Sequence, residues 1–180
     1  HPLAILEPRP TLAPSPIPVS PAETPQDFVV LPFDHDVALG AYDPKGILDE
    51  VDMSIQHAYV VWFLTEDFSK TIEEARAKKR FPLISLEPWP LLVDGLSAET
   101  LLQDINEGRY DKYIRDLAER AKFQKPQTIL VRWGHEMELT GLYPWSQGDS
   151  EAYVSAYRRV VDIFEGLGAD NVYWVWSPGG

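Results

Sequence analysis

The sequence predicts an α/β fold built on a parallel β-sheet, and three patterns support this. Short apolar runs alternate with longer amphipathic stretches after a proline-rich start, a spacing typical of βαβ units. The apolar runs are hydrophobic on both faces, as buried parallel strands are. Polar and aromatic residues gather where these runs end, which is where α/β proteins place their binding sites. The functional site is therefore expected along one edge of the sheet.

Residues 1–26 form a segment of a different kind, rich in proline: Pro2, Pro8, Pro10, Pro14, Pro16, Pro18, Pro21 and Pro25. Proline fixes φ and lacks a backbone donor, which excludes a helix or a central strand. We expect an extended linker or a strap lying on the domain, followed by a second unit over residues 27–180. Such a linker fits a secreted or periplasmic protein, and equally a linker between domains of a longer chain.

Five apolar runs predict the strands of the sheet. The first ends at Asp43-Pro44, the third ends in Glu87-Pro88-Trp89-Pro90, and the last is followed by Ser177-Pro178. Each boundary carries residues that stop regular structure. The predicted strands are 37–42, 55–64, 81–86, 128–133 and 172–176.

Three amphipathic stretches predict helices between these strands. The first runs to Lys79 with Ser69 as its expected N-cap. The second covers 110–123 and places its apolar residues on one face. The third covers 151–167 and is closed by Gly168.

Two architectures fit this order of elements, a doubly wound sheet and a (β/α)-barrel. Dinucleotide-binding sheets carry a glycine-rich turn after the first strand, and none follows residues 37–42. This argues against dinucleotide binding and leaves both architectures open. The fold we predict is a (β/α)-barrel of the TIM type, which keeps its active site at the strand ends, with only the first five or so of its eight βα units in this chain. The alternative is an architecture that is not a closed barrel. The exposed sheet edges require a cover, from the remainder of the barrel or from another chain.

Composition excludes several classes of function. The formal net charge of −12 leaves no basic footprint for nucleic acid. No apolar run reaches the length of a membrane span. The absence of cysteine excludes disulfides, thiolate metal sites and a cysteine nucleophile. Aromatic residues reach 12% and can serve as flat faces for sugars or as ordinary core residues; no cofactor is indicated.

The run Arg132-Trp133-Gly134-His135-Glu136 carries the main candidate chemistry. Strand alternation places Arg132, Gly134 and Glu136 on one side and Trp133 and His135 on the other. Partial desolvation of Glu136 near Trp133 would raise its pKa, as a general acid requires. His135 can donate to a sugar hydroxyl or a second carboxylate, and Arg132 can anchor a carboxylate. The alternative is a structural Arg–Glu ion pair beside a packed histidine.

A metal site is not supported. A zinc helix of the His-Glu-x-x-His type needs histidine at position 139, which is Leu139. Asp34-His35-Asp36 has a suitable composition for a metal, but it precedes the first strand and is better explained as a solvated turn.

These residues also resemble a known family. Arg132-Trp133-Gly134-His135-Glu136-Met137, followed by Gly141 and Tyr143-Pro144-Trp145, is similar to the signature of glycoside hydrolase family 26. Leu39-Gly40-Ala41-Tyr42 and the run 172–178 resemble that family's first and fifth strands. The family contains retaining (β/α)-barrel enzymes that include endo-β-mannanases and some β-glucanases and xylanases. The resemblance implies that 27–180 is the N-terminal portion of a glycosidase-like barrel acting on a polysaccharide or oligosaccharide.

The resemblance assigns roles to single residues. It implies Glu136 as acid/base, His135 as a contact to substrate or nucleophile, and Tyr143 or Trp145 as a sugar subsite. Further expected contacts to substrate, near strand ends, are Tyr42, Trp62, Glu87, Trp89 and Trp176, with Arg132 as structural support. Glu138 replaces an asparagine common in the family, and the loop before Tyr143 lacks a usual tryptophan; both departures bear on the substrate.

A retaining mechanism needs a second carboxylate about 5–5.5 Å from the first. The family places it after the seventh strand, beyond this chain, and Glu87 is the best positioned candidate within it. The expected function is a retaining endo-β-glycanase acting on mannan or β-glucan, with the isolated piece inactive. The alternative is a non-catalytic glycan-binding protein, or an accessory protein of polysaccharide synthesis or export, that keeps the fold.

Overall fold

The computed structural model describes residues 38–91, 96–147 and 149–179. The chain divides into two units, 1–32 and 33–180, and all described residues belong to the second. The predicted proline-rich segment 1–26 and the turn Asp34-His35-Asp36 lie outside the described residues.

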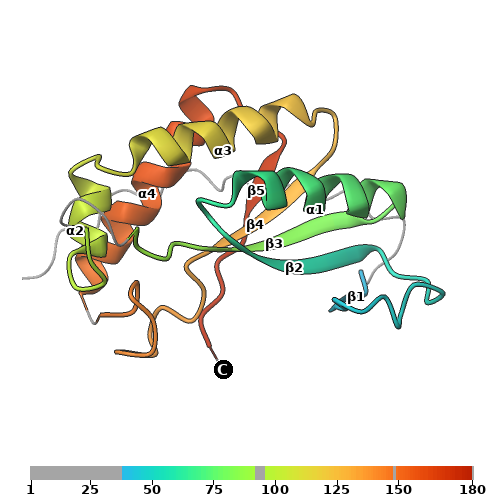
Figure 1. Ribbon diagram of the computed structural model, residues 1–180, viewed down its shortest axis with the longest axis horizontal. Helices are drawn as coiled ribbons and strands as arrows, with labels where there is room; N and C mark the ends of the chain where they lie inside the picture. Colours follow the sequence, from blue (N-terminus) through green and yellow to red (C-terminus); the bar gives the residue numbers. More distant parts are fainter. Residues whose placement is uncertain (1–37, 92–95, 148, 180) are drawn as a thin grey trace, which may run out of the picture. The chain divides into compact units, whose positions relative to one another are not determined.

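The described strands form one parallel sheet in the order of the sequence, β1-β2-β3-β4-β5 (Figure 1). Every neighbouring pair is parallel. A doubly wound sheet reverses its strand order at a switch point, and this sheet does not. The chain is thus an α/β protein whose sheet is consistent with part of a TIM-type fold. The strands are Gly40–Tyr42 (β1), Ile55–Val61 (β2), Phe81–Glu87 (β3), Ile129–Trp133 (β4) and Val172–Trp174 (β5).

Figure 1 shows α1, α3 and α4 along the same face of the sheet. One prediction about these helices was wrong, and one helix was missed. Ser69 lies inside α1, where its hydroxyl reaches the Thr65 carbonyl, and the residue before the helix, Leu64, makes no side-chain cap. A short helix, α2, was not predicted because its six residues are too few to show a helical period. The helices are Thr65–Ala77 (α1), Leu101–Asn106 (α2), Asp111–Phe123 (α3) and Ser150–Gly166 (α4).

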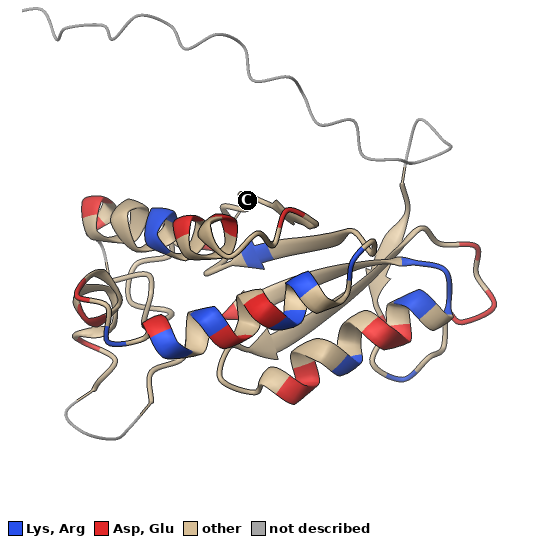
Figure 2. Cartoon of the chain, turned by 90° about the horizontal axis from the view of Figure 1, so that it is seen from above, with Lys and Arg blue, Asp and Glu red and all other residues tan. Residues whose placement is uncertain are grey.

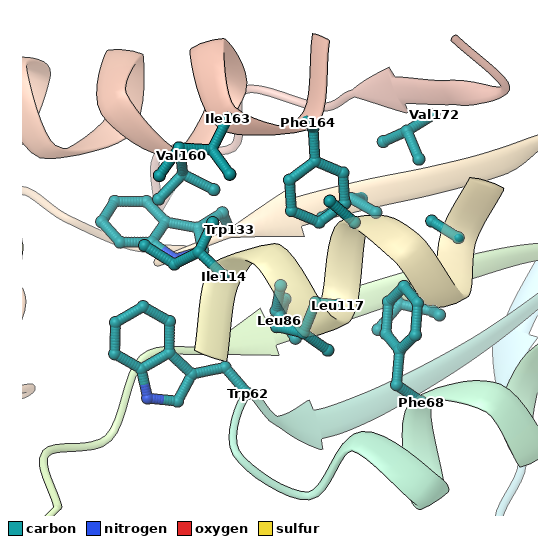
Figure 3. Packing of buried hydrophobic residues seen from close by; sticks show 14 of the residues in the cluster. Trp62, Phe68, Leu86, Ile114, Leu117, Trp133, Val160, Ile163, Phe164 and Val172 are labelled. Atoms are coloured by element: carbon teal, nitrogen blue, oxygen red, sulfur yellow. The ribbon is translucent and has the colours of Figure 1, made fainter. Parts of the chain in front are cut away.

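The hydrophobic core lies between the helices and one face of the sheet. Figure 3 shows Trp62 and Trp133 reaching from the ends of β2 and β4 toward Ile114 of α3. Both indoles are about 1% exposed. Burying side chains of this size contributes on the order of 2–3 kcal/mol each, so these two residues hold the helix layer on the sheet.

The charged residues lie mainly on the outer surfaces of the helices. Figure 2 shows acidic and basic residues interspersed along α1, α3 and α4, and several form exposed ion pairs such as Lys70–Glu74. No described helix is long and apolar enough to cross a membrane. In the described ranges there is also no group of three or more His, Asp or Glu side chains arranged to hold a metal ion.

The other face of the sheet carries polar and aromatic side chains. Tyr59, Ser85 and Arg132 stand side by side on β2, β3 and β4, because the register pairs Tyr59 with Ser85 and Ser85 with Arg132. Tyr42 and His57 are paired in the same way on β1 and β2. Strand alternation therefore gives the sheet one apolar face and one face suited to polar chemistry.

Candidate active site at the carboxyl end of the sheet

A sharp change of backbone direction after β4 shapes the site. Gly134 has φ +55° and Glu136 has φ +53°, both in the left-handed region that disfavours side chains. A Cβ at position 134 would lie 3.3 Å from Tyr153 and 3.4 Å from Trp145. Both the conformation and the limited space therefore favour glycine here.

This turn overturns the predicted alternation of the motif. His135 was expected beside Trp133, but its ring lies 5.5 Å from the ring of Tyr59, on the face that carries Arg132. Trp133 stays on the helix face, against Tyr153. It therefore does not desolvate Glu136 as predicted. The physical reason is that alternation holds only while the backbone stays extended, and Gly134 ends the extended stretch.

Glu136 is half-buried and held at two points. The hydroxyl of Tyr143 donates to Glu136 Oε2 at 3.1 Å. The Glu136 backbone N–H donates to the Ser177 carbonyl at 3.0 Å, which ties the end of β4 to the segment after β5. Burial, and then the hydrogen bond to Glu136 and the Glu136 charge, raise the pKa of Tyr143, so this phenol stays protonated and remains a donor at neutral pH.

Trp145 supports the site from below, which corrects the prediction that it lines a sugar subsite. It is 1% exposed, and its indole N–H donates to the His135 carbonyl at 2.8 Å. Its ring is stacked on Tyr143, with centroids 4.7 Å apart and planes 3° from parallel. Trp145 therefore fixes Tyr143 and the backbone of His135, and its own ring is almost fully buried.

Ser146 holds the same loop and was missed by the sequence reasoning. Its hydroxyl accepts from the Tyr143 N–H at 2.9 Å and donates to the Leu139 carbonyl at 2.7 Å. It is fully buried. A serine in an aromatic loop gives no sequence signal of this kind, because its partners are backbone groups of the same loop, which any residue type would supply.

His135 is buried among aromatic rings. It is 3% exposed, and its ring lies 5.2 Å from that of Tyr143. Burial and then the nearby Arg132 lower its pKa, against the opposite influence of Glu87 and Glu136. The imidazole is therefore neutral at pH 7, and its Nδ1 has no hydrogen-bond partner among the described residues.

Glu87 and Trp89 bring the end of β3 to the site. The Trp89 indole N–H donates to Glu87 Oε2 at 3.1 Å, and its ring meets that of Tyr143 edge-on at 6.5 Å. Both side chains are half-buried. Trp62, predicted to line the cleft, instead lies in the core against Tyr110 and donates to the Trp89 carbonyl. That prediction was wrong because Trp62 falls on the helix-facing side of its strand.

Trp176, also predicted to line the cleft, lies on the other side of the sheet from His135. It is 54% exposed, and its ring contacts Tyr153 and Tyr157 of α4. It borders a separate cavity of about 310 Å³ with Met137 and Glu138. The structure therefore does not group Trp176 with Glu136.

Tyr42, which the sequence predicts as a contact to substrate, lies on β1 and extends the polar face to that strand. It is 53% exposed and meets Tyr59 edge-on at 5.1 Å. Beside it, His57 Nε2 lies 2.7 Å from the Ser85 hydroxyl. Tyr59, His57 and Ser85 were not predicted as site residues. His57 and Tyr59 are two residues apart on β2, and Tyr59 and Ser85 are in register with Arg132, so all of them share one face of the sheet.

Taken together, the described residues form an α/β protein with a carboxyl group at the end of β4 and a second carboxylate at the end of β3, each hydrogen-bonded to a half-buried aromatic residue. The exposed rings of Tyr42 and Tyr59 lie on β1 and β2 of the same sheet. Carboxyl groups of this kind can transfer protons, and exposed rings can bind sugars.

Comparison with known proteins agrees with this chemistry. The chain is similar to Endoglucanase H of Acetivibrio thermocellus, with 33% identity over 134 residues, covering 69% of the chain and 13% of that protein. The similarity supports a relationship to glycoside hydrolases. No protein-family model matches the chain, and no solved structure matches it.

Proposed function

We propose that this chain contributes the acid/base part of the active site of a retaining endo-β-glycanase of glycoside hydrolase family 26. The observation that carries the proposal is the carboxyl of Glu136, held by Tyr143 beside the neutral ring of His135 at the end of β4. The similarity to an endoglucanase supports a β-linked glycan as substrate, with β-glucan or mannan as the candidates.

In the first step, Glu136 gives its proton to the glycosidic oxygen as the bond to the anomeric carbon breaks. A second carboxylate bonds to that carbon from the opposite face of the sugar. In the second step, Glu136 removes a proton from water, which displaces the enzyme carboxylate. The second carboxylate is expected outside the described residues.

The remaining residues have supporting roles in this proposal. Tyr143 orients the Glu136 carboxyl, and Trp145 orients Tyr143. Glu87, Trp89 and Tyr42 offer polar groups and exposed or half-exposed rings along the same edge, where sugar hydroxyls and ring faces can bind.

The test uses the natural full-length protein and measures reducing-sugar release from mannan and mixed-linkage β-glucan. Glu136→Gln should reduce hydrolysis by about 10²–10⁴-fold, the usual contribution of a general acid/base. Glu119→Gln is the matched control, because it makes the same change at an exposed position on α3, in the helix layer. The anomer released first, followed by NMR, reports retention. Unchanged hydrolysis by Glu136→Gln would refute the assignment, and binding without hydrolysis by the wild type would support a non-catalytic glycan-binding protein instead.

A further inference from the structure

Arg132 lies at the centre of the polar face and is fixed by three hydroxyl groups. Its Nε donates to the Ser85 hydroxyl at 2.8 Å, and its terminal nitrogens donate to the hydroxyls of Ser177 and Tyr59, each at 3.3 Å. Its guanidinium carbon also lies 5.7 Å from the centre of the Tyr59 ring. These partners come from β2, β3 and the segment after β5, so the guanidinium is locked across the sheet.

The positive charge of Arg132 has no counter-charge in the part of the chain that the structure describes. No carboxylate there lies within ion-pair distance, and Glu136 and Glu87 bond to Tyr143 and Trp89 instead. A half-buried charge whose hydrogen bonds all go to neutral hydroxyl groups is costly unless an anion pairs with it.

The histidines around Arg132 do not share the charge. Burial, and then the charge of Arg132, lower the pKa of His57 to about 4, and the pKa of His135 is lowered by the same two causes. Both rings are therefore neutral at pH 7. The titratable groups around the guanidinium are His57 and Tyr59 on β2 and His135 after β4. The carboxylates of Glu87 and Glu136 act on the same His135 ring.

The hydrogen bonds of Arg132 leave room for a carboxylate. An arginine has five N–H donors in a planar fork. Ser85 takes the donor on Nε, and Ser177 and Tyr59 take one donor on each terminal nitrogen. One donor therefore remains on each terminal nitrogen, and such a pair matches the two oxygens of a carboxylate.

We propose that Arg132 binds a second protein carboxylate, supplied from outside the described residues, and holds it ionised as the nucleophile that acts opposite Glu136. This inference rests on the proposed function. A protein carboxylate is favoured over an acidic sugar because Arg132 projects from within β4, is tied to neighbouring strands and is less exposed than the Tyr59 ring against which it packs. Arg132 is thus a positioning residue for the reaction.

The main experiment compares pH profiles of kcat/KM in the full-length protein for Arg132→Gln, Arg132→Lys and Tyr59→Phe. An arginine beside a carboxylate lowers its pKa by about 1–3 units. The acid limb of the profile should therefore move up by about that amount in Arg132→Gln and stay near the wild-type position in Arg132→Lys. Tyr59→Phe, which removes one hydroxyl partner but no charge, should leave the limb in place. An unmoved limb in a folded, active Arg132→Gln variant would overturn the proposal.

Folding failure of Arg132→Gln would not end the test. Arg132→Lys keeps the charge but loses the fork, so it should lower kcat at least about tenfold, equivalent to one bidentate contact of 1.4 kcal/mol, with little change in KM. An unchanged kcat would contradict the proposal. If the Arg132 variants lost activity on acidic polysaccharides alone and kept it on neutral substrates, the proposal would also be overturned. Arg132 would then be a residue that binds an acidic sugar.

A second measurement does not depend on catalysis, so it separates this inference from the proposed function. A carboxylate whose pKa is depressed by Arg132 stabilises the folded state above its unfolded value near 4, and this stabilisation is lost as pH falls through the folded value. Two variants are compared, His57→Gln and His57→Gln/Arg132→Gln, because removing His57 removes the nearby titration. The free energy of unfolding should fall more steeply with decreasing pH in the variant that keeps Arg132. Equal acid sensitivity would overturn the pairing, whereas absence of hydrolysis by the wild type would refute only the enzyme.

Discussion

The hydrogen bond from Tyr143 to Glu136 allows a direct test of the proposed chemistry. Tyr143→Phe removes the hydroxyl that donates to Glu136 Oε2 at 3.1 Å and keeps the ring stacked on Trp145. The loop should therefore hold its shape while the Glu136 carboxyl loses one of its constraints.

The size of the effect follows from the bond. Hydrogen bonds to charged groups contribute about 1.5–3 kcal/mol, and about 1.4 kcal/mol corresponds to a tenfold change in rate. The observed separation of 3.1 Å exceeds the 2.5–2.7 Å of the strongest hydroxyl–carboxylate bonds. We therefore expect a loss near the lower end, roughly tenfold in kcat/KM on polysaccharide.

The assay compares two kinds of substrate. The leaving groups of polysaccharides are poor and need a proton, whereas the aryl groups of activated aryl glycosides leave with little help from an acid. Tyr143→Phe should therefore lower kcat/KM for polysaccharides and change kcat/KM for aryl glycosides little. Tyr157→Phe is the matched control, since it removes a phenol from α4, on the helix-facing side of the sheet. An equal loss on both substrates would refute the reasoning, because it would show that Tyr143 acts through binding and not through Glu136.

Two further predictions concern stability. Gly134→Ala should destabilise the domain by about 1–3 kcal/mol and reduce activity, because it adds left-handed strain and places a Cβ 3.3 Å from Tyr153. Gly141→Ala is the control, because Gly141 has φ +80° but open space around it, so its thermal unfolding should show the cost of the strain alone. The pKa of about 4 for His57 means that the unfolded chain binds more protons between pH 6.5 and 4, so stability falls as pH falls through that window. His57→Gln should flatten this loss in calorimetry, and an unchanged pH dependence would argue against a neutral, buried His57.

The order of elements was largely predictable from the sequence, whereas the site was only partly so. All described strands coincide with predicted runs, since buried parallel strands give clear apolar signals. The error at Trp62 has a specific cause, because proximity to a strand end does not say which face a side chain takes. At Trp145 the error arose because an aromatic residue in a loop can support a binding ring instead of being one. Neither distinction is encoded by local pattern.

Some contacts of Arg132 could be predicted from the sequence and others could not. The two-residue spacing of His57 and Tyr59, set in register with Ser85 and Arg132, is visible in the sequence once the strands are known. The hydrogen bond from Arg132 to Ser177 joins residues 45 positions apart. It depends on how β5 lies beside β4, which local periodicity does not determine.

The turn at Gly134 explains how one short motif serves the whole site. A continuous strand would place Arg132 and Glu136 on one face and His135 on the other. Two left-handed residues, Gly134 and Glu136, break that pattern, and the ring of His135 comes to lie against Tyr59, on the face of Arg132. A charge, a neutral imidazole and a carboxyl thereby meet at one strand end. Left-handed strain at Glu136 is the conformational cost of this arrangement, and the bonds to Ser177 and Tyr143 offset it.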